Sequence, residues 1–133
     1  GVITRRDILE KMSREQVSSL PTFSDQIAQK LVQNANVFSF TVEPFMLENN
    51  GVLSHGVLTE ILNTATHQLV ASNGRSLIIE QMMIYFLQAV QLDDYLTLTS
   101  RVVHETRRSA IIDYDVYLDH QLVAKATMTV KIN

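Results

Sequence analysis

A long helical pattern from Ser54 to Asn73, followed almost entirely by strand patterns, constrains this fold most strongly. Apolar residues recur three and four positions apart along it and therefore share one helix face: Leu58, Ile61, Leu62, Ala65 and Leu69. Ser54 is a favourable N-cap residue, and Gly74 suits the left-handed conformation that ends many helices. A helix of about 18 residues is about 27 Å long, so its apolar face needs a broad surface to cover it.

The chain beyond this helix has the patterns of β-strands. Residues 76–90 are a nearly continuous apolar run, which is typical of a strand covered on both faces, although the pattern alone does not exclude a helix. Alternating patterns predict further strands over 96–102, 112–118 and 122–132, with a tight hairpin at 119–121. We therefore expect an α+β fold in which one long helix packs against one curved antiparallel sheet.

Two shorter elements are predicted before the long helix. Ser24 precedes apolar residues at helical spacing and predicts a capped helix of about three turns that extends to Val32. Alternation over 37–42 predicts a strand. Residues 13–21 are mostly polar and predict a linker. The main domain is therefore expected to occupy residues 21–133.

The first dozen residues, GVITRRDILEKM, resemble the end of a CBS domain, whose last strand and helix often have the sequence GIVTRRDIL. The resemblance implies that residues 1–20 are the C-terminal remnant of a CBS-like domain plus a linker, and that the chain is the C-terminal piece of a longer protein. An ordinary strand, turn and short helix is the alternative.

Composition argues against several classes of function. The 133 residues include no cysteine, which excludes disulfides, thiolate catalysis and cysteine-ligated zinc. The four histidines lack the short spacing of metal ligands, so we expect no metal. A net charge of −3 without a long basic run, and the absence of a stretch of about 18 apolar residues, argue against nucleic-acid and membrane partners. A cytoplasmic location is expected.

Three motifs resemble the hotdog thioesterase superfamily. Asn49 precedes His55-Gly56 at the start of the long helix, FLQAVQLDDYL from Phe86 is similar to the family's FLRPV...GD.L, and LVAKAT from Leu122 is similar to its closing LVA.A..T. The resemblance covers about residues 23–133. It implies the hotdog fold, in which a sheet wraps a central helix, and a coenzyme A ester as ligand or substrate with no other cofactor. With its CBS-like start, the chain resembles the hotdog module of bacterial regulatory proteins.

The start of the long helix is the candidate reaction centre. Thioester hydrolysis needs a polarised carbonyl oxygen, and the free N–H groups and dipole at a helix N-terminus favour developing negative charge. The resemblance implies that the Gly56 N–H polarises the carbonyl, that His55 positions the thioester or shapes a loop, and that Asn49 holds water or orients the ligand. The alternatives are close helix packing for Gly56, backbone hydrogen bonding for His55 and turn formation for Asn49.

The sequence departs from the family's pattern at the carboxylate that hydrolysis needs. Many hotdog thioesterases have an acidic residue nine positions after the histidine, where this chain has Thr64, which cannot act as a base at neutral pH. Glu60 is the only carboxylate on the helix and shares a polar side with Asn63 and His67. Glu60 is a candidate base or nucleophile, and Asn63 or Thr64 could hold a water. A solvated or dimer-facing Glu60 is the alternative.

Arg107 and Arg108, between two predicted strands, are candidates for clamping the phosphates of coenzyme A at the pocket mouth, although loop arginines are commonly only solvated. Because hotdog pockets usually lie between two protomers, we expect a homodimer or larger assembly in which residues 76–90 pair with their own copy.

Three functions remain open. The first is an acyl-CoA thioesterase. The second is a non-catalytic acyl-CoA sensor within a transcriptional or metabolic regulator. The third is an acyl dehydratase or hydratase, since Gly56-Val57-Leu58 and Glu60 partly match that class; however, the glutamate comes one residue early and the proline before the glycine is missing.

Overall fold

The structure, a computed structural model, describes residues 22–71 and 74–133. The CBS-like segment expected over residues 1–20 lies outside these ranges. The elements follow in the order α2 (Phe23–Lys30), β1 (Val32–Asn34), β2 (Val37–Thr41), the 3-10 helix η1 (Pro44–Met46), α3 (His55–Ala71), β3 (Leu77–Phe86), β4 (Tyr95–Glu105), β5 (Ser109–Leu118) and β6 (Gln121–Ile132).

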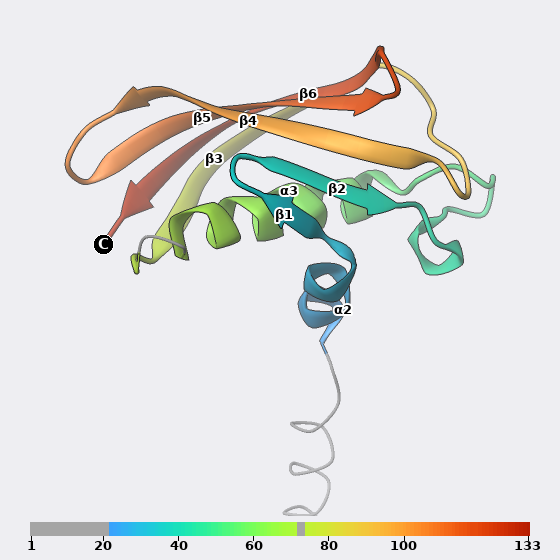
Figure 1. The fold of residues 1–133 in the computed structure, drawn as a ribbon, viewed down its shortest axis with the longest axis horizontal. Coiled ribbons are helices and arrows are strands. Elements are labelled where there is room, and N and C mark those ends of the chain that lie inside the picture. Colours follow the sequence, from blue (N-terminus) through green and yellow to red (C-terminus); the bar gives the residue numbers. More distant parts are fainter. Residues whose placement is uncertain (1–21, 72–73) are drawn as a thin grey trace, which may run out of the picture.

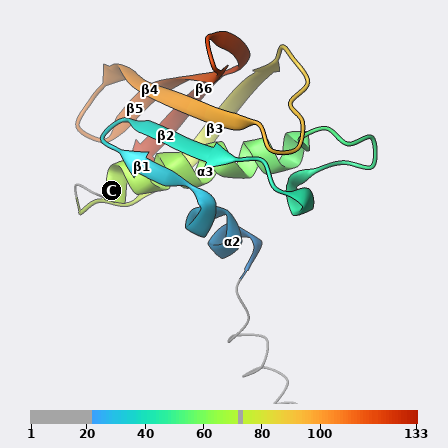
Figure 2. The ribbon, with the colours of Figure 1, turned by 45° about the vertical axis from the view of Figure 1, so that its right-hand side comes forward.

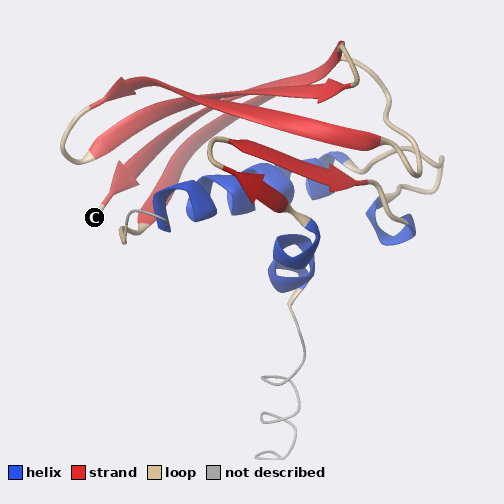
Figure 3. Ribbon diagram, viewed as in Figure 1, coloured by secondary structure: helices blue, strands red, loops and turns tan. Residues whose placement is uncertain are grey.

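The six strands form one antiparallel sheet in the order β1-β2-β4-β5-β6-β3. Directly after α3 the chain forms β3, which lies at the edge of the sheet opposite β1. The later strands β4, β5 and β6 then lie between β2 and β3. Figure 1 shows the curved sheet on one side of α3, and Figure 3 shows the same separation of strands from helices. The predicted hotdog fold, one long helix against an antiparallel sheet, is confirmed.

The core lies between α3 and the concave face of the sheet. The apolar stripe predicted for the helix is buried at four of its five positions, Leu58, Ile61, Leu62 and Ala65, while Leu69 is half-buried. The alternating strand residues that meet this stripe are also buried: Phe38, Phe40, Leu96, Leu98, Ile112, Val116, Met128 and Val130. Burial of each large apolar side chain contributes about 1.5–3 kcal/mol, so this contact holds α3 in place.

One polar cluster is built into that core. The Thr66 hydroxyl donates to the backbone oxygen of Leu62 over 2.8 Å, and its oxygen lies 2.8 Å from the hydroxyl oxygen of Tyr114. Because a threonine has one hydroxyl proton, which Leu62 receives, Tyr114 is the donor to Thr66. Both side chains are completely buried, and this pairing satisfies their polar groups.

The beginning of the domain differs from the sequence prediction in two ways. α2 begins at Phe23 with Thr22 as its N-cap, because Thr22 and Asp25 form a reciprocal capping box with distances of 3.1 and 3.0 Å. Ser24, the predicted cap, lies inside the helix. Val32 also leaves the helix and begins β1, since Ala35 adopts a left-handed φ of 57° in the tight turn that pairs β1 with β2.

β3 ends at Phe86, four residues before the end of the strand predicted over 76–90. The amides of Leu87 and Gln88 both donate to the backbone oxygen of Val123, where β6 bulges, so the ladder cannot continue. Residues 87–90 then cross toward α3, and Val90 accepts a hydrogen bond of 2.7 Å from the amide of Leu53. This crossing places an apolar segment beside the start of the central helix.

α2 lies on the side of α3 opposite the sheet, as Figure 2 shows. Within residues 22–71 and 74–133, no helix has the length and apolar character required to cross a membrane.

Candidate functional site

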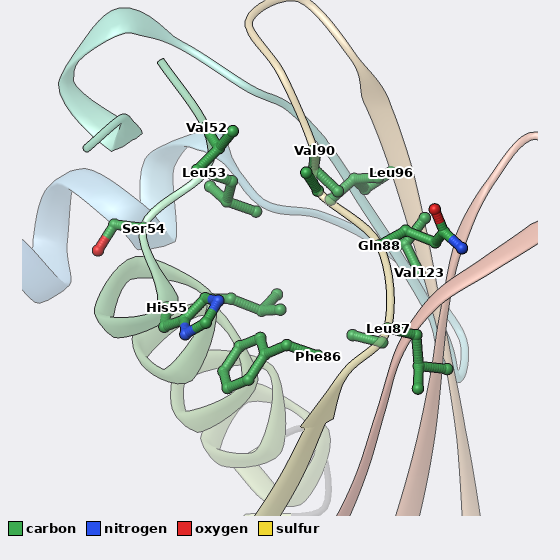
Figure 4. Close-up of a pocket in the computed structure, with 13 residues that line it drawn as sticks. Val52, Leu53, Ser54, His55, Phe86, Leu87, Gln88, Val90, Leu96 and Val123 are labelled. Carbon is green, nitrogen blue, oxygen red and sulfur yellow. The ribbon is translucent and has the colours of Figure 1, made fainter. Parts of the chain in front are cut away.

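A pocket of about 230 Å³ opens at the first turn of α3. Its walls come from the residues just before the helix, from the crossing segment after β3 and from the adjacent parts of β4 and β6, as Figure 4 shows. The lining is mainly apolar and includes Leu53, Leu58, Leu87, Val90, Leu96 and Val123. The predicted residue His55 and the helix cap Ser54 supply polar groups. This composition is typical of a small-molecule site with an apolar body and a few polar groups.

His55 lies in the pocket wall and is held there by an aromatic contact. Its ring stacks on the ring of Phe86 with centroids 3.6 Å apart and an interplanar angle of 8°. His55 is the first residue of α3 and Phe86 the last residue of β3, so the contact joins helix and strand beside the pocket. The stacking fixes the plane of the imidazole without using either of its nitrogens as a hydrogen-bond partner.

The first turn of α3 presents backbone donors to its surroundings. The Ser54 hydroxyl accepts from the amide of Val57 over 3.4 Å, and the Ser54 backbone oxygen accepts from Leu58 over 3.1 Å, as expected of an N-cap. Among the described residues, the amides of His55 and Gly56 have no acceptor. Two free donors therefore lie at the positive end of the helix dipole.

The exposed Gly56 is not required by the packing of its own chain. A Cβ atom at this position would lie 3.6 Å from the Ser54 hydroxyl oxygen, which is an ordinary van der Waals contact, and its φ is not positive. The alternative that glycine permits close packing of the helix start therefore has no support within the chain.

The remaining helix candidates lie elsewhere. Glu60, Asn63 and Thr64 line a groove of about 350 Å³ between α2 and α3, together with His67. The Ser24 hydroxyl donates to the Glu60 carboxylate over 2.7 Å, and the Asn63 amide approaches the same oxygen at 3.5 Å. The predicted polar side of the helix is thus present, but it faces α2 and not the pocket beside His55.

Asn49 lies in the exposed loop that precedes α3, in a surface hollow with Glu48 and Asn50. The turn is supported by the next residue, Asn50, whose side-chain oxygen accepts from the amide of Val52 over 3.2 Å. Asn49 does not line the pocket of His55.

Arg107 and Arg108 lie in the β4–β5 hairpin, at the end of α3 opposite His55 (Figure 1). Both line a hollow of about 390 Å³ with Arg75 and Lys131, two cations that the sequence reasoning did not connect to them. Arg75 donates to the backbone oxygen of Arg107 over 3.0 Å. Lys131 is the fourth cation of this hollow. The pairing of β5 with β6 places it opposite Ser109, directly after the two arginines, and a predicted register of these strands would have identified it.

A larger hollow contains none of the predicted site residues. It measures about 590 Å³, lies between the last turns of α3, the β1–β2 hairpin and the β4–β5 end of the sheet, and is lined by Leu69, Val102, Ile112 and Ile132 among others. We place the candidate site at the smaller pocket, because it combines an apolar lining with His55 at the start of α3, next to the free amides of the first turn; Gly56 itself does not line it. In the part of the chain that the structure describes, no three His, Asp or Glu side chains are grouped to hold a metal.

A central helix wrapped by one antiparallel sheet, with a pocket against its first turn, defines a hotdog domain of the thioesterase type. The family model of the thioesterase superfamily matches residues 50–125, more than half of the chain. The chain therefore belongs to the thioesterase superfamily.

Individual relatives add detail. The uncharacterized protein YtoI of Bacillus subtilis (strain 168) is 27% identical over 143 residues, which cover 99% of this chain but 32% of that protein; the chain thus spans about a third of its length. A hypothetical thioesterase from Streptococcus pneumoniae TIGR4, solved with coenzyme A, is 28% identical with a TM-score of 0.68, covering 73% of this chain and 79% of that one. Zebrafish thioesterase superfamily member 2 shares the fold, with 18% identity, a TM-score of 0.74 and coverage of 98% and 99%.

Proposed function

We propose that this domain binds acyl-CoA-type thioesters, with the thioester carbonyl at the first turn of α3 and the acyl group in the pocket beside His55. The observation that carries the proposal is the pair of free amides at His55 and Gly56 next to an apolar pocket. The presence of coenzyme A in the structure of the pneumococcal relative supports this ligand class.

The chemistry of the helix start suits a thioester. The carbonyl oxygen accepts from the Gly56 amide and is stabilised by the helix dipole. His55, held by Phe86, borders the pocket and contacts the thioester. Asn49, in the loop before the helix, orients the part of the ligand outside the pocket. Arg107 and Arg108 lie at the opposite end of α3, so they hold its phosphates only where the ligand lies between two subunits.

Hydrolysis is the second candidate, and Glu60 is the residue that would carry it. Gly56, Glu60 and Asn63 follow one another at spacings of four and three residues, so they share one stripe of α3. A ligand that crosses the outer side of the first turn would reach this stripe, where Glu60 could act as base or nucleophile and Asn63 or Thr64 could hold a water. The hydrogen bond from Ser24 already engages the Glu60 carboxylate. We therefore favour binding without turnover. A dehydratase would need the same glutamate and has less support.

We further propose a homodimer built on the free edge of β3. This strand is at the end of the sheet, and its exposed side chains include Ile78, Met83 and Tyr85, which are 59%, 48% and 56% exposed. Among its ten residues only Glu80 is charged and none is proline or lysine, so the edge has few of the features that prevent strand pairing.

The physiological role that we propose is that of a ligand-sensing module in a cytoplasmic regulatory protein with CBS domains. The CBS-like residues 1–12 support this context, and so does the much greater length of the Bacillus subtilis relative.

Calorimetric titration with coenzyme A, acetyl-CoA and longer acyl-CoAs tests the proposal, with free thiol measured in parallel. Saturable binding without thiol release supports a sensor, and thiol release that Glu60→Gln abolishes supports a thioesterase. If none of these esters binds and none is hydrolysed, the proposed function is wrong.

A further inference from the structure

We infer that the pocket beside His55 selects an uncharged acyl group of at most about eight carbons, and that Leu96 and Ala124 at its deep end set this limit. The inference rests on the proposed function and deepens it, because it names the class of acyl group that the same site takes. The proposed function alone leaves the length and the charge of that group open.

The lining of the pocket divides into a mouth and a deep end. His55, Phe86 and Leu87 are exposed and lie at the mouth, whereas Leu96 and Ala124 are buried. Figure 4 shows His55 and Phe86 on one side of the pocket and Leu96 on the other. Leu96 and Ala124 also belong to the hydrophobic core, so the pocket ends in the core and does not lead through the domain. An acyl chain that enters past His55 therefore has a fixed depth available.

A β-bulge in β6 builds part of the deep end. Val123 and Ala124 follow one another, and the side chains of successive strand residues normally point to opposite faces of a sheet. Here both side chains are buried and both line the pocket, because the pairing of β5 with β6 shifts register between Val116 and Tyr117. Ala124 is the smallest of the buried lining residues, so it leaves space that a larger side chain would fill.

The pocket offers no partner for a charge at the far end of an acyl group. None of the described residues that line it is aspartate, glutamate, lysine or arginine. Its polar side chains, Ser54, His55 and Gln88, are half-buried or exposed and so lie toward the mouth, while every buried lining residue is apolar. A carboxylate carried to the deep end would lose its hydration without gaining a partner, which is strongly unfavourable.

The volume of the pocket sets the length of the acyl group. An apolar cavity of about 150 Å³ holds one benzene molecule, so each carbon with its hydrogens needs about 25 Å³. The pocket of about 230 Å³ accordingly holds about nine non-hydrogen atoms, which corresponds to an octanoyl group with its carbonyl oxygen. Further methylene groups have to stay at the mouth, in contact with water. Because each buried methylene contributes about fourfold in affinity, affinity should rise with chain length up to about octanoyl and then stay constant.

A first experiment measures affinity against chain length. The wild type is titrated with acetyl-, butyryl-, octanoyl- and dodecanoyl-CoA, with free thiol measured in parallel; where the esters are hydrolysed, kcat/KM replaces affinity. We expect a rise of about two- to fourfold per methylene group from acetyl-CoA to octanoyl-CoA and no further rise for dodecanoyl-CoA. Equal affinity for all four esters, or a rise that continues to dodecanoyl-CoA, would overturn the inferred limit.

A second experiment tests the exclusion of charge with two ligands of one shape. The acyl groups of isovaleryl-CoA and malonyl-CoA have the same number of non-hydrogen atoms and the same branching, but only malonyl carries a carboxylate. We expect isovaleryl-CoA to bind at least about tenfold more tightly. Malonyl-CoA that binds as tightly as isovaleryl-CoA, or more tightly, would contradict an uncharged acyl group.

Two variants change the depth of the pocket in opposite directions. Ala124→Val adds two methyl groups and should move the limit to about hexanoyl-CoA, while Leu96→Ala opens the deep end and should let decanoyl-CoA bind more tightly than octanoyl-CoA. The matched controls, Ala126→Val and Leu98→Ala, make the same changes at buried positions of β6 and β4 that do not line the pocket. Both controls should keep the wild-type limit.

Thermal unfolding verifies that each variant is folded. Leu96→Ala and Leu98→Ala both truncate a fully buried leucine, so a shift in preferred chain length that appears only in Leu96→Ala reports on the pocket and not on stability. An unchanged limit in either folded pocket variant, or the same shift in its control, would remove Leu96 and Ala124 as the residues that set the limit. If the wild type neither binds nor hydrolyses any of these esters, the proposed function itself fails. That result is distinct from a failure of this inference, in which the esters bind without regard to length or charge.

Discussion

The imidazole of His55 and the phenyl ring of Phe86 lie face to face, with ring centroids 3.6 Å apart. The contact connects the first residue of the central helix to the last residue of the edge strand. It also closes one side of the pocket at the helix start, so a change at Phe86 acts on the ligand site through the position of His55.

Phe86→Leu should therefore weaken acyl-CoA binding by a few-fold and lower the free energy of unfolding by about 1 kcal/mol, because a stacked aromatic pair contributes about 0.5–1.5 kcal/mol beyond its buried area. Titration calorimetry and urea unfolding measure the two effects. Tyr95→Leu is the control, since Tyr95 is an exposed aromatic residue on β4 that does not line this pocket. Unchanged ligand affinity in Phe86→Leu would argue against a role for the ring pair.

Gly56→Ala should separate stability from binding. Alanine is favoured over glycine inside a helix by about 0.5–1 kcal/mol, and the added Cβ meets only the Ser54 hydroxyl oxygen at 3.6 Å. We expect thermal unfolding at a higher temperature together with weaker acyl-CoA binding, because the methyl group lies beside the amide that the carbonyl must reach. Gly74→Ala is the matched control: its φ of 72° is left-handed, so it should destabilise the fold by about 1–2 kcal/mol. Full binding by Gly56→Ala would remove Gly56 from the site.

The buried Tyr114 predicts a loss of stability at high pH. Burial raises the pKa of its hydroxyl to about 12, whereas an unfolded chain has the ordinary value of about 10. Between these values the unfolded state releases the proton and the folded state retains it, so the free energy of unfolding falls as pH rises. The contribution is complete below pH 10, and about 2–3 kcal/mol is lost by pH 12.

Urea unfolding between pH 8 and pH 12 measures this decline. The difference between the wild type and Tyr114→Phe isolates Tyr114 from the other tyrosines, and the variant should decline less steeply. Thr66→Val should cost about 1–3 kcal/mol at neutral pH, since it leaves the Tyr114 hydroxyl buried without its acceptor. Parallel pH profiles for the wild type and Tyr114→Phe would contradict the prediction.

Thr64→Asp tests whether the missing acid limits hydrolysis. The substitution restores a carboxylate at the position where many hotdog thioesterases resembling this chain have one. Because position 64 lines the α2–α3 groove and not the pocket beside His55, we expect acyl-CoA hydrolysis above the wild-type rate only if the ligand extends along α3 to that groove. Thr64 is buried against the α2–α3 groove, so a stability loss of about 1–3 kcal/mol should accompany the change. Thr64→Asn has nearly the same shape without the charge and is the control. Equal hydrolysis by the two variants would show that the carboxylate is not what the wild type lacks.

The β3 edge predicts a charge-dependent dimer. If β3 pairs antiparallel with its own copy along its full length, position 83 comes close to Glu80 of the partner subunit, where β3 bulges. Met83→Glu therefore places like charges across the interface and Met83→Lys places opposite charges there. Sedimentation velocity at micromolar concentration should show dissociation of the glutamate variant and a retained dimer for the lysine variant. The same sedimentation for both variants would place the interface elsewhere.

The pattern of apolar residues was enough to predict the helix and the sheet. The stripe from Leu58 to Ala65 has a period that only a helix satisfies, and the alternation in β4, β5 and β6 has a period that only strands satisfy. Where the structure differs from the sequence prediction, local hydrogen bonds set the ends of the elements. Thr22 outcompeted Ser24 as a cap because Asp25 completes its capping box, and the bulge at Val123 ended β3 at Phe86.

The candidate site was predictable only in part. His55 and Gly56 are adjacent in the chain, so their shared place at the helix start follows from the motif. Glu60 was assigned to a helix side correctly, but periodicity cannot say that this side faces α2 and Ser24. The association of Arg75 with Arg107, Arg108 and Lys131 depends on strand order.

The sequence by itself determined the long helix, the main strands, their apolar faces and the free donors at the start of α3, because these follow from short-range spacing and from the geometry of a single helix or strand. Only the tertiary structure decided that Phe86 stacks on His55, that the crossing segment closes the pocket, and that the arginines lie at the opposite end of the helix from it. These relationships join residues distant in the chain, and they depend on sheet order and on where strands stop, which no local pattern encodes.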